Sequence, residues 1–294
     1  MEIEQTQDLM KLIQIKFPRL SKGQKLIADF TLKNYDKAAF MTAAKLGDSV
    51  GVSESTVVRF AIELGFSGYP KLQKALQELI KNKLTSVQRL ELSNDYACEE
   101  NVLRGVLKSD IENLRATLEK INLENFNSVI DEIFKAKTVY IVGLRSSSAI
   151  AEFLGFYLRL IIKDVRVVAH NISNIFEQMI NCDEGDLVIG IGFPRYALRT
   201  INGLEFAKER KAKVVAITDS NVSPLATVAD YALIAQSNMA SFVDSLVAPL
   251  SVINALIVAV GVREKDKITS TFYELEELWK NYDIYSYNQN NIER

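Results

Sequence analysis

The sequence predicts two domains of different class, an all-α domain followed by a three-layer α/β domain. Three observations support this division. At 294 residues the chain is about two domains long. Its first 80 residues show helical apolar spacing broken by turn residues, without a convincing strand between the helices. After Ala136, short runs rich in valine and isoleucine alternate with amphipathic stretches, as in a buried parallel sheet covered by helices.

The first domain is predicted to consist of short helices. Apolar residues recur at helical spacing in four successive groups, with turn signals at Pro18, Gly51 and Gly65 to Pro70. A polar, weakly patterned stretch follows, and a helical pattern resumes from Asn101 to Leu118. The expected boundaries are a first domain at 1–80, a linker at 81–107, a second domain at 108–281 and a polar tail at 282–294.

The second domain is predicted to alternate strands and helices. Each apolar run is short and nearly continuous, which fits strands buried on both faces of a parallel sheet. The runs are Thr138–Val142, Val165–Ala169, Leu187–Ile191, Val214–Ile217 and Tyr231–Ala235. Strand and helix alternate five times, so this domain is expected to be a three-layer α/β fold.

Charge is distributed unevenly along the chain. Residues 1–83 hold 13 basic and 9 acidic side chains, whereas the remainder holds 22 basic and 28 acidic ones, for a net charge of −2 overall. A mildly basic first domain on an acidic second one indicates a nucleic-acid partner. The charge distribution alone is equally consistent with an ordinary solvated surface.

Histidine and cysteine usage excludes several chemistries. The chain has one histidine, His170, so it cannot build a zinc site with two or three histidines, and any histidine-assisted nucleophile would depend on that residue. Cys98 and Cys182 lack CxxC spacing and predict neither a disulfide framework nor a metal knuckle. We expect two buried or inert thiols, no metal, no cofactor and no catalytic residue.

No targeting or membrane segment is predicted. The first ten residues carry three acidic side chains and no apolar core. The longest apolar stretch, Leu246–Val262, is 17 residues long and is interrupted by Pro249, Ser251 and Asn254. A membrane span needs about 20 mostly apolar residues, so we expect a buried helix there and a soluble, cytoplasmic protein.

The segment from Met41 to Gly68 has the pattern of a helix-turn-helix. A first helix at Thr42–Ser49 is expected to end near Gly51, and Ser53 is then placed to cap a second helix at Glu54–Leu64. That second helix is about 16 Å long, enough to lie in a major groove. The residues expected to contact DNA are Ser53, Glu54, Ser55, Thr56 and Arg59. The alternative from this pattern alone is a helical hairpin whose polar face meets water.

Residues 20 to about 77 resemble the N-terminal domain of RpiR-type bacterial transcriptional regulators. The resemblance is carried by LSKGQKLIADFTLKN, by the run AAKLGDSVGVSESTVVRFAIELGFSGYPKLQKAL and by their spacing. It implies that this domain binds double-stranded operator DNA.

Two loops of the second domain have the composition of an anion site. Gly143 follows the first strand and leads into Ser146 and Ser147 at a helix start, where hydroxyls and free N–H groups hold phosphates. A second loop, from Gly192 to Thr200, follows the strand Leu187–Ile191 and contains Arg195. The alternatives are simple helix capping by one serine and an ordinary surface arginine.

Residues 137–157 and 186–235 resemble the sugar isomerase (SIS) domain, most closely in AKVVAITDSNVSPLATVADYALIA. The resemblance implies a five-stranded parallel sheet that binds phosphosugars and is usually dimeric, here a homodimer or homotetramer. The sequence departs from the family at Gly192 and Ala197, where polar residues are usual, so one side of the phosphate site has fewer hydroxyls. Backbone amides at Gly192 are expected to serve instead.

The ligand residues expected from the two loops and from the end of the second strand are Ser146, Ser147, Gly192, Arg195, Thr200 and His170. The function expected is that of a transcriptional regulator controlled by a phosphosugar. Two alternatives stay open: an aldose–ketose phosphate isomerase, for which no base is evident beyond Glu152 or Glu177, and a regulator whose sensor is degenerate.

Overall fold

The computed structural model describes residues 4–80, 87, 89, 99–168, 174–239 and 242–285. Contacts divide the chain into two compact units, Met1–Ala97 and Cys98–Arg294. Helix α8 (Glu99–Lys120) begins inside the linker expected at 81–107, so the last part of that stretch is helical and belongs to the second unit. The helix is longer than the apolar pattern showed because its first turn is polar.

The first unit is helical throughout its described residues, as predicted. Its elements are α1 (Glu4–Lys16), the short 3-10 turn η1 (Phe17–Arg19), α2 (Lys22–Lys33), α3 (Tyr35–Ala38), α4 (Ala43–Val50), α5 (Glu54–Glu63) and α6 (Tyr69–Ile80). Their apolar faces meet in one core built around Leu9, Ile27, Phe60 and Leu72. Burial of these side chains is the main force that holds helices this short in place.

The second unit is built on the predicted five-stranded parallel sheet. Its strands are β1 (Val139–Gly143), β2 (Val165–Val168), β3 (Leu187–Ile191), β4 (Lys213–Thr218) and β5 (Tyr231–Ile234), in the order β2-β1-β3-β4-β5. The strand order reverses between β1 and β3, which are paired with Gly143 opposite Ile191. In such sheets ligands bind beyond the carboxyl ends of the two strands at the reversal.

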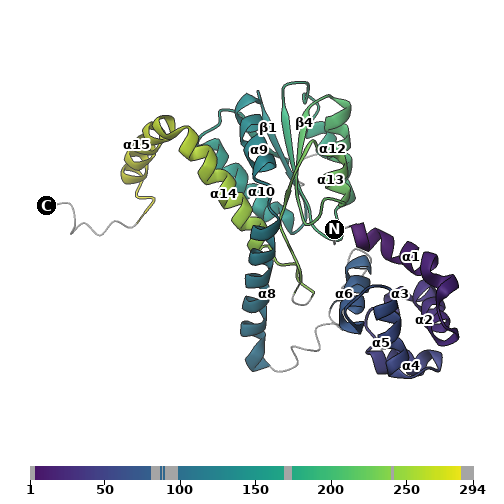
Figure 1. The fold of residues 1–294 in the computed structure, drawn as a ribbon. Coiled ribbons are helices and arrows are strands. Elements are labelled where there is room, and N and C mark those ends of the chain that lie inside the picture. Colours follow the sequence, from purple (N-terminus) through teal and green to yellow (C-terminus); the bar gives the residue numbers. More distant parts are fainter. Residues whose placement is uncertain are drawn as a thin grey trace. The chain divides into compact units, whose positions relative to one another are not determined.

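Helices cover both faces of this sheet (Figure 1). On one face Ile141 and Ile189 pack with α9 (Leu123–Lys135), α10 (Ser147–Arg159) and α14 (Val247–Arg263). On the other, Tyr140 and Val188 pack with α11 (Ile175–Gln178), α12 (Leu198–Glu209) and α13 (Pro224–Val228). Alternate strand residues therefore enter two separate cores, which is the three-layer arrangement that the sequence predicted.

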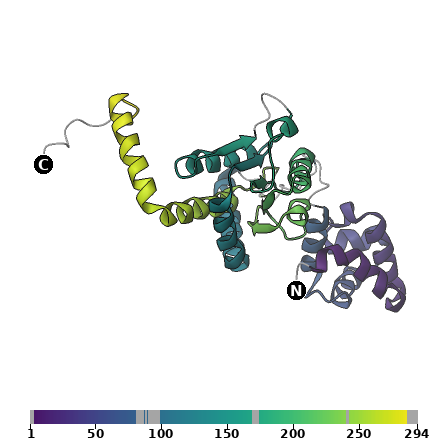
Figure 2. The same cartoon turned by 90° about the horizontal axis from the view of Figure 1, so that it is seen from above.

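Two further helices extend the second unit. Helix α8 is joined to the segment after β5 because the Asn113 side chain bonds both backbone groups of Asn238, at 3.0 and 3.1 Å. Helix α15 (Lys265–Asn281) follows α14 and lies away from the sheet in both views (Figures 1 and 2). The predicted helix at Leu246–Val262 is α14, but the expectation that it is buried holds for one side only, since Val258 and Val262 are exposed.

No single helix of the described ranges is both long and apolar enough to cross a membrane. Helices α14 and α15 reach that length and composition only when they are counted together, and they are bent by 100° relative to each other.

Candidate nucleic-acid interface and ligand site

Helices α4 and α5 form the predicted helix-turn-helix through a tight turn. Helix α4 ends at Gly51, whose φ of 72° lies in the left-handed region that glycine tolerates best. The Val52 N–H donates to the Gly47 carbonyl at 2.9 Å. A Cβ on Gly47 would lie 2.6 Å from the Val52 oxygen, so only glycine allows the turn to approach this closely.

The two sides of α5 differ sharply in burial. Val57, Phe60 and Ala61 are buried against the neighbouring helices of the first unit. Ser53, Glu54, Ser55 and Arg59 are exposed, whereas Thr56 is half-buried, because a Cβ on Gly23 would be only 3.3 Å from its methyl group. The structure therefore brings four of the five predicted DNA-contacting residues to the outer face and leaves Thr56 at its edge.

The hydroxyls at the start of α5 bond to one another rather than to the helix. Ser53 occupies the predicted cap position, but its side chain accepts no backbone N–H. Its Oγ lies 2.9 Å from both Ser55 Oγ and Thr56 Oγ1. The capping bond was wrongly predicted, and the first-turn N–H groups are left without a side-chain acceptor. Such a helix start favours a phosphate or a base edge.

Polar residues of α6 hold the segment that leads into α4, a feature that the sequence reading missed. The Tyr69 hydroxyl donates to the Met41 carbonyl at 2.8 Å, and Gln73 donates to the same oxygen at 2.9 Å. Gln77 donates to the Ala39 carbonyl at 3.0 Å. The sequence signal for these contacts is that the three polar residues recur every four positions, which places their side chains on one face of α6. Burial raises the pKa of Tyr69 to about 12, so this hydroxyl stays protonated.

The loop after β1 presents the two predicted serines differently. Ser146 is exposed and makes no capping bond, so the alternative of simple capping by this residue is not what the structure shows. Ser147 is only 5% exposed at the first position of α10. Arg145, which was not singled out from the sequence, is exposed with a φ of 58°. Its left-handed backbone has no sequence signature.

The loop after β3 uses Gly192 for packing. Its N–H donates to the Ile217 carbonyl at 3.1 Å, so the expectation that this amide would bind an anion is wrong. A Cβ there would lie 2.8 Å from Leu225 Cδ2, which gives a steric reason for glycine at this position. Arg195 is exposed, with a φ of 64°. The two loops therefore each place an arginine in a left-handed conformation beyond neighbouring strands.

Thr200 is the most unusual residue of this edge. It lies in the first turn of α12 and is 1% exposed, yet its Oγ1 has no hydrogen-bond partner within the described part of the chain. Buried hydroxyls are nearly always paired, and within the described part of the chain Thr31 and Ser237 are the other buried residues whose hydroxyl has no partner. Side-chain caps close α2, α4, α9, α11 and α13, whereas α3, α5, α10, α12, α14 and α15 have none.

A hydrogen-bond network links the neighbouring loops. The Tyr196 hydroxyl donates to Asp219 Oδ1 at 2.7 Å, and the Gln236 amide donates to the Asp219 carbonyl at 3.1 Å. The Gln236 N–H in turn donates to Thr117 Oγ1 of α8 at 2.8 Å. The loops after β3, β4 and β5 are thus connected to α8, a link that spacing along the sequence does not reveal.

The remaining candidate residues are His170 and the two cysteines. His170 and Cys98 lie outside the described residues. Cys182 is buried and free, and burial raises the pKa of its thiol to about 11, which confirms an inert thiol at this position. Among the described residues, no group of three or more His, Cys, Asp and Glu side chains is arranged to hold a metal ion.

A helix-turn-helix with an outward polar face, combined in one chain with an α/β unit of this strand order, is the domain organisation of a transcriptional regulator. The chain belongs to the RpiR family of HTH-type transcriptional regulators. Residues 7–83 match the helix-turn-helix domain of the rpiR family, and residues 132–259 match the SIS domain.

Three known proteins illustrate the similarity. An HTH-type transcriptional regulator of Clostridium perfringens (strain 13 / Type A) is 27% identical over 226 residues, 76% of this chain and 80% of that protein. The sugar isomerase domain of an RpiR transcription factor from Sphaerobacter thermophilus is 32% identical, with a TM-score of 0.58 over 60% of this chain and 99% of that one. The Vibrio vulnificus NanR protein, solved in complex with ManNAc-6P, has the same fold at 20% identity, with a TM-score of 0.55 over 95% and 100% of the two chains.

Proposed function

We propose that this regulator reads operator DNA with the exposed face of α5. The observation that carries the proposal is the division of α5 into a buried apolar side and an outward side bearing Ser53, Glu54, Ser55 and Arg59. Arg59 offers a two-pronged donor for guanine, and Glu54 an acceptor for the cytosine amino group. Ser53 and Ser55, with Thr56 beside them, supply hydroxyls for a phosphate or a base edge.

The effector proposed is a phosphosugar at the carboxyl ends of β1 and β3. The uncapped starts of α10 and α12 and the unpaired hydroxyl of Thr200 support it. Ser146, Ser147 and Thr200 would donate hydroxyl hydrogen bonds to the phosphate, and Arg195 would contribute a positive charge. Gly192 would bring the loop after β3 near the ligand, while its N–H stays bonded to the Ile217 carbonyl. His170 remains a proposed contact after β2.

Control by the effector follows from linkage between two sites. A ligand that binds one arrangement of a homodimer more tightly shifts the population toward it. Two helix-turn-helix units then match, or fail to match, half-sites about 34 Å apart. The protein is proposed to act in the cytoplasm and to bind its sugar phosphate without converting it. Glu152 is exposed on α10, and the Glu177 carboxylate accepts the Asn174 N–H at 3.1 Å, so neither is a poised base.

The test begins with selection of duplexes by the full-length protein from a random pool. Binding of the enriched duplex is then measured by fluorescence anisotropy across a salt series, with and without each member of a panel of hexose and pentose phosphates. The proposal predicts sequence-specific, salt-sensitive binding that at least one sugar phosphate changes. Absence of sequence preference would overturn the DNA proposal. Specific DNA binding that no sugar phosphate alters would favour the degenerate sensor, and measurable turnover would favour the isomerase.

A further inference from the structure

Helix α8 is attached to its unit mainly through polar groups. Within the part of α8 whose side chains the structure describes, residues 102–120, the buried side chains are those of Asn113 and Thr117, which are 1% and 6% exposed. Its large apolar side chains are exposed, namely Val102, Leu103, Leu107, Ile111 and Leu118. Helices are usually held by burial of an apolar face. The position of α8 therefore depends strongly on hydrogen bonds, which require a defined geometry.

Three polar residues on one side of α8 bond the stretch between β5 and α14. They are Asp110, Asn113 and Thr117, at spacings of three and four residues. The Ser245 hydroxyl donates to Asp110 Oδ1 at 2.6 Å, and the Gln236 N–H donates to Thr117 Oγ1 at 2.8 Å. The Asn113 side chain bonds both backbone groups of Asn238. A shift of the stretch after β5 must therefore either move α8 or break these bonds.

The same stretch is bonded to the loop of the candidate ligand site. The Gln236 side-chain amide donates to the Asp219 carbonyl at 3.1 Å, and Asp219 Oδ1 accepts the hydrogen of the Tyr196 hydroxyl at 2.7 Å. Tyr196 directly follows Arg195 in the loop after β3. Three hydrogen bonds and the backbone of two residues thus lead from the proposed phosphate loop to Thr117 on α8.

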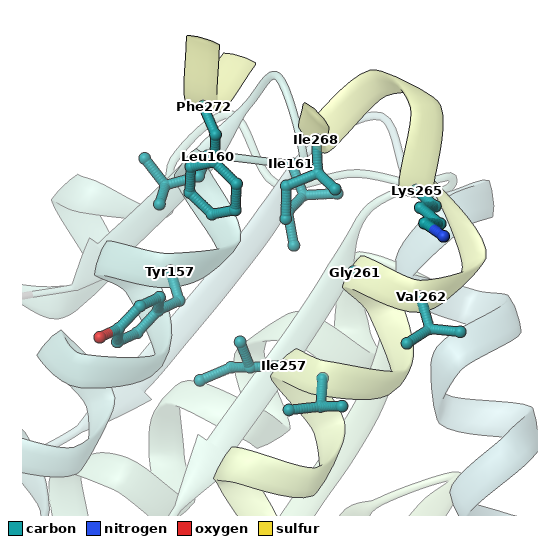
Figure 3. Close-up of a pocket in the computed structure, with 10 residues that line it drawn as sticks. Tyr157, Leu160, Ile161, Ile257, Gly261, Val262, Lys265, Ile268 and Phe272 are labelled. Carbon is teal, nitrogen blue, oxygen red and sulfur yellow. The ribbon is translucent and has the colours of Figure 1, made fainter. Parts of the chain in front are cut away.

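The apolar cavity of this unit does not offer a sugar phosphate another place to act from (Figure 3). It has a volume of about 360 Å³ and lies between α10, α14 and α15. Tyr157 and Lys265 are the lining residues with a polar side-chain group. A sugar phosphate carries several hydroxyls and a charge, all of which need partners when they leave water. The loop that carries Arg195 and Tyr196 is therefore the better starting point.

We propose that Tyr196, Asp219, Gln236 and Thr117 form a relay that couples sugar-phosphate binding at the sheet edge to the position of α8. The inference rests on the effector proposed above and names the residues through which it acts. Helix α8 begins at Glu99, two residues after the first unit ends at Ala97. A change at α8 is therefore passed along the chain to the helix-turn-helix unit.

The first bond of the relay suits a change between two states. A phenol has one hydrogen to donate, so Asp219 either receives it from Tyr196 or does not. The neighbouring Arg195 has a φ of 64°, a sparsely populated conformation for a residue with a side chain, so another loop conformation lies close in energy. A phosphate that binds one loop conformation better than the other shifts the population toward it, and with it the Tyr196–Asp219 bond.

The first part of the test needs no sugar phosphate. Hydrogen exchange of the full-length protein is read by mass spectrometry in wild type and in Tyr196→Phe, which keeps the ring and removes the hydroxyl. Residues 99–120 should exchange about two- to fivefold faster in the variant, because loss of the first bond loosens the anchor of α8. Thr227→Val is the matched control, since its hydroxyl donates to the Pro224 carbonyl outside the relay. Unchanged exchange of α8 in Tyr196→Phe would overturn the inference.

The second part measures coupling with the hexose or pentose phosphate of the panel that wild type binds most tightly. Its effect on affinity for the selected duplex should be about 5- to 150-fold in wild type, as is usual for coupled sites. In Tyr196→Phe and Thr117→Val this factor should fall toward one, while calorimetry shows the sugar phosphate still bound. Thr117→Ser keeps the hydroxyl and should keep the factor, as should Thr227→Val. Circular dichroism melting checks that each variant is folded.

Full coupling in Tyr196→Phe or in a folded Thr117→Val would overturn the relay. Equal loss in Thr117→Ser and Thr117→Val would do so too, because packing and not the hydroxyl would then matter. Loss of sugar-phosphate binding in Tyr196→Phe would make that residue a ligand contact instead. A wild type that binds no sugar phosphate would refute the effector proposal, and the exchange experiment would then still decide whether the loop after β3 is connected to α8.

Discussion

The two candidate sites of this chain hold their polar side chains in opposite ways. On α5 the candidate residues point outward from a helix whose other side is buried, so the site is a surface that exists without a ligand. At the sheet edge, Ser147 and Thr200 are almost fully buried and Gly192 lies under Leu225. The candidate DNA site therefore consists of exposed side chains on α5. The candidate ligand site consists of loop backbone around a few buried hydroxyls.

The largest effects are expected at the glycine on which each site is built. A Cβ on Gly47 would meet the Val52 oxygen at 2.6 Å, and one on Gly143 would meet Ala151 Cβ at 2.7 Å. Neither neighbour can swing aside, so Gly47→Ala and Gly143→Ala should each cost about 1–3 kcal/mol. Hydrogen exchange read by mass spectrometry should show lost protection only in residues 4–80 for the first variant and only in 99–285 for the second.

The matched control is Gly203→Ala in α12, where the nearest atom is the flexible Ile175 Cδ1 at 3.3 Å. This variant should change protection little. Loss of protection in both units from either test substitution would contradict the separation of the two sites.

The variant Thr200→Val tests whether the buried hydroxyl of Thr200 belongs to the ligand site. Removing an unpaired buried hydroxyl should leave the melting temperature unchanged or raise it. Affinity for the sugar phosphate that binds wild type best should nevertheless fall about 10- to 100-fold, the value of a hydrogen bond to a charged group. Titration calorimetry measures this, with Thr227→Val as control, because that hydroxyl already donates to the Pro224 carbonyl at 2.9 Å. Unaltered affinity would remove Thr200 from the site.

Tyr69 gives the stability of the helix-turn-helix unit a pH dependence. Burial raises the pKa of Tyr69 to about 12, above its unfolded value near 10. The stability that the neutral phenol contributes is complete below pH 10 and is lost as the pH rises toward 12. Tyr69→Phe should cost about 1 kcal/mol at neutral pH and flatten that decline. Urea melts of the first unit's signal at several pH values test this, and an equally steep decline in the variant would refute it.

Cys182 is expected to resist chemical modification while the protein is folded. With its thiol pKa near 11, this residue should react with iodoacetamide at pH 7.4 at least 100-fold more slowly than a free cysteine. The Cys98→Ser variant isolates Cys182, and urea should restore rapid labelling. Fast labelling of the folded protein would show that the packing around Cys182 opens readily.

The sequence predicted most of what depends on periodicity. Residues Glu54 to Leu64 were assigned to a helix with Val57 and Phe60 inward, because a period of 3.6 separates buried from exposed side chains. The five strands could be placed because continuous Val and Ile runs suit a sheet covered on both faces. Boundaries moved by one or two residues, as at Val139–Gly143.

What the sequence could not predict depends on three-dimensional contact. The Gly192 N–H is bound to Ile217, which lies on a neighbouring strand 25 positions along the chain. The left-handed conformations of Arg145 and Arg195 and the unpaired hydroxyl of Thr200 arise from loop geometry, which apolar patterns do not encode. The uncovered side of α14 was invisible as well, because an apolar run does not say how many of its sides are covered.

The most direct test of the central claim compares the two arginines of residues 1–80, Arg59 on α5 and Arg19 at the end of η1. Each is replaced by alanine in the full-length protein, and binding to the selected duplex and to a scrambled one is measured at fixed salt. Both variants lose one positive charge, so both should bind scrambled DNA slightly less well. Arg59→Ala alone should lose about 1–3 kcal/mol of preference for the selected duplex. Equal preference in the two variants would contradict the claim that α5 reads the operator.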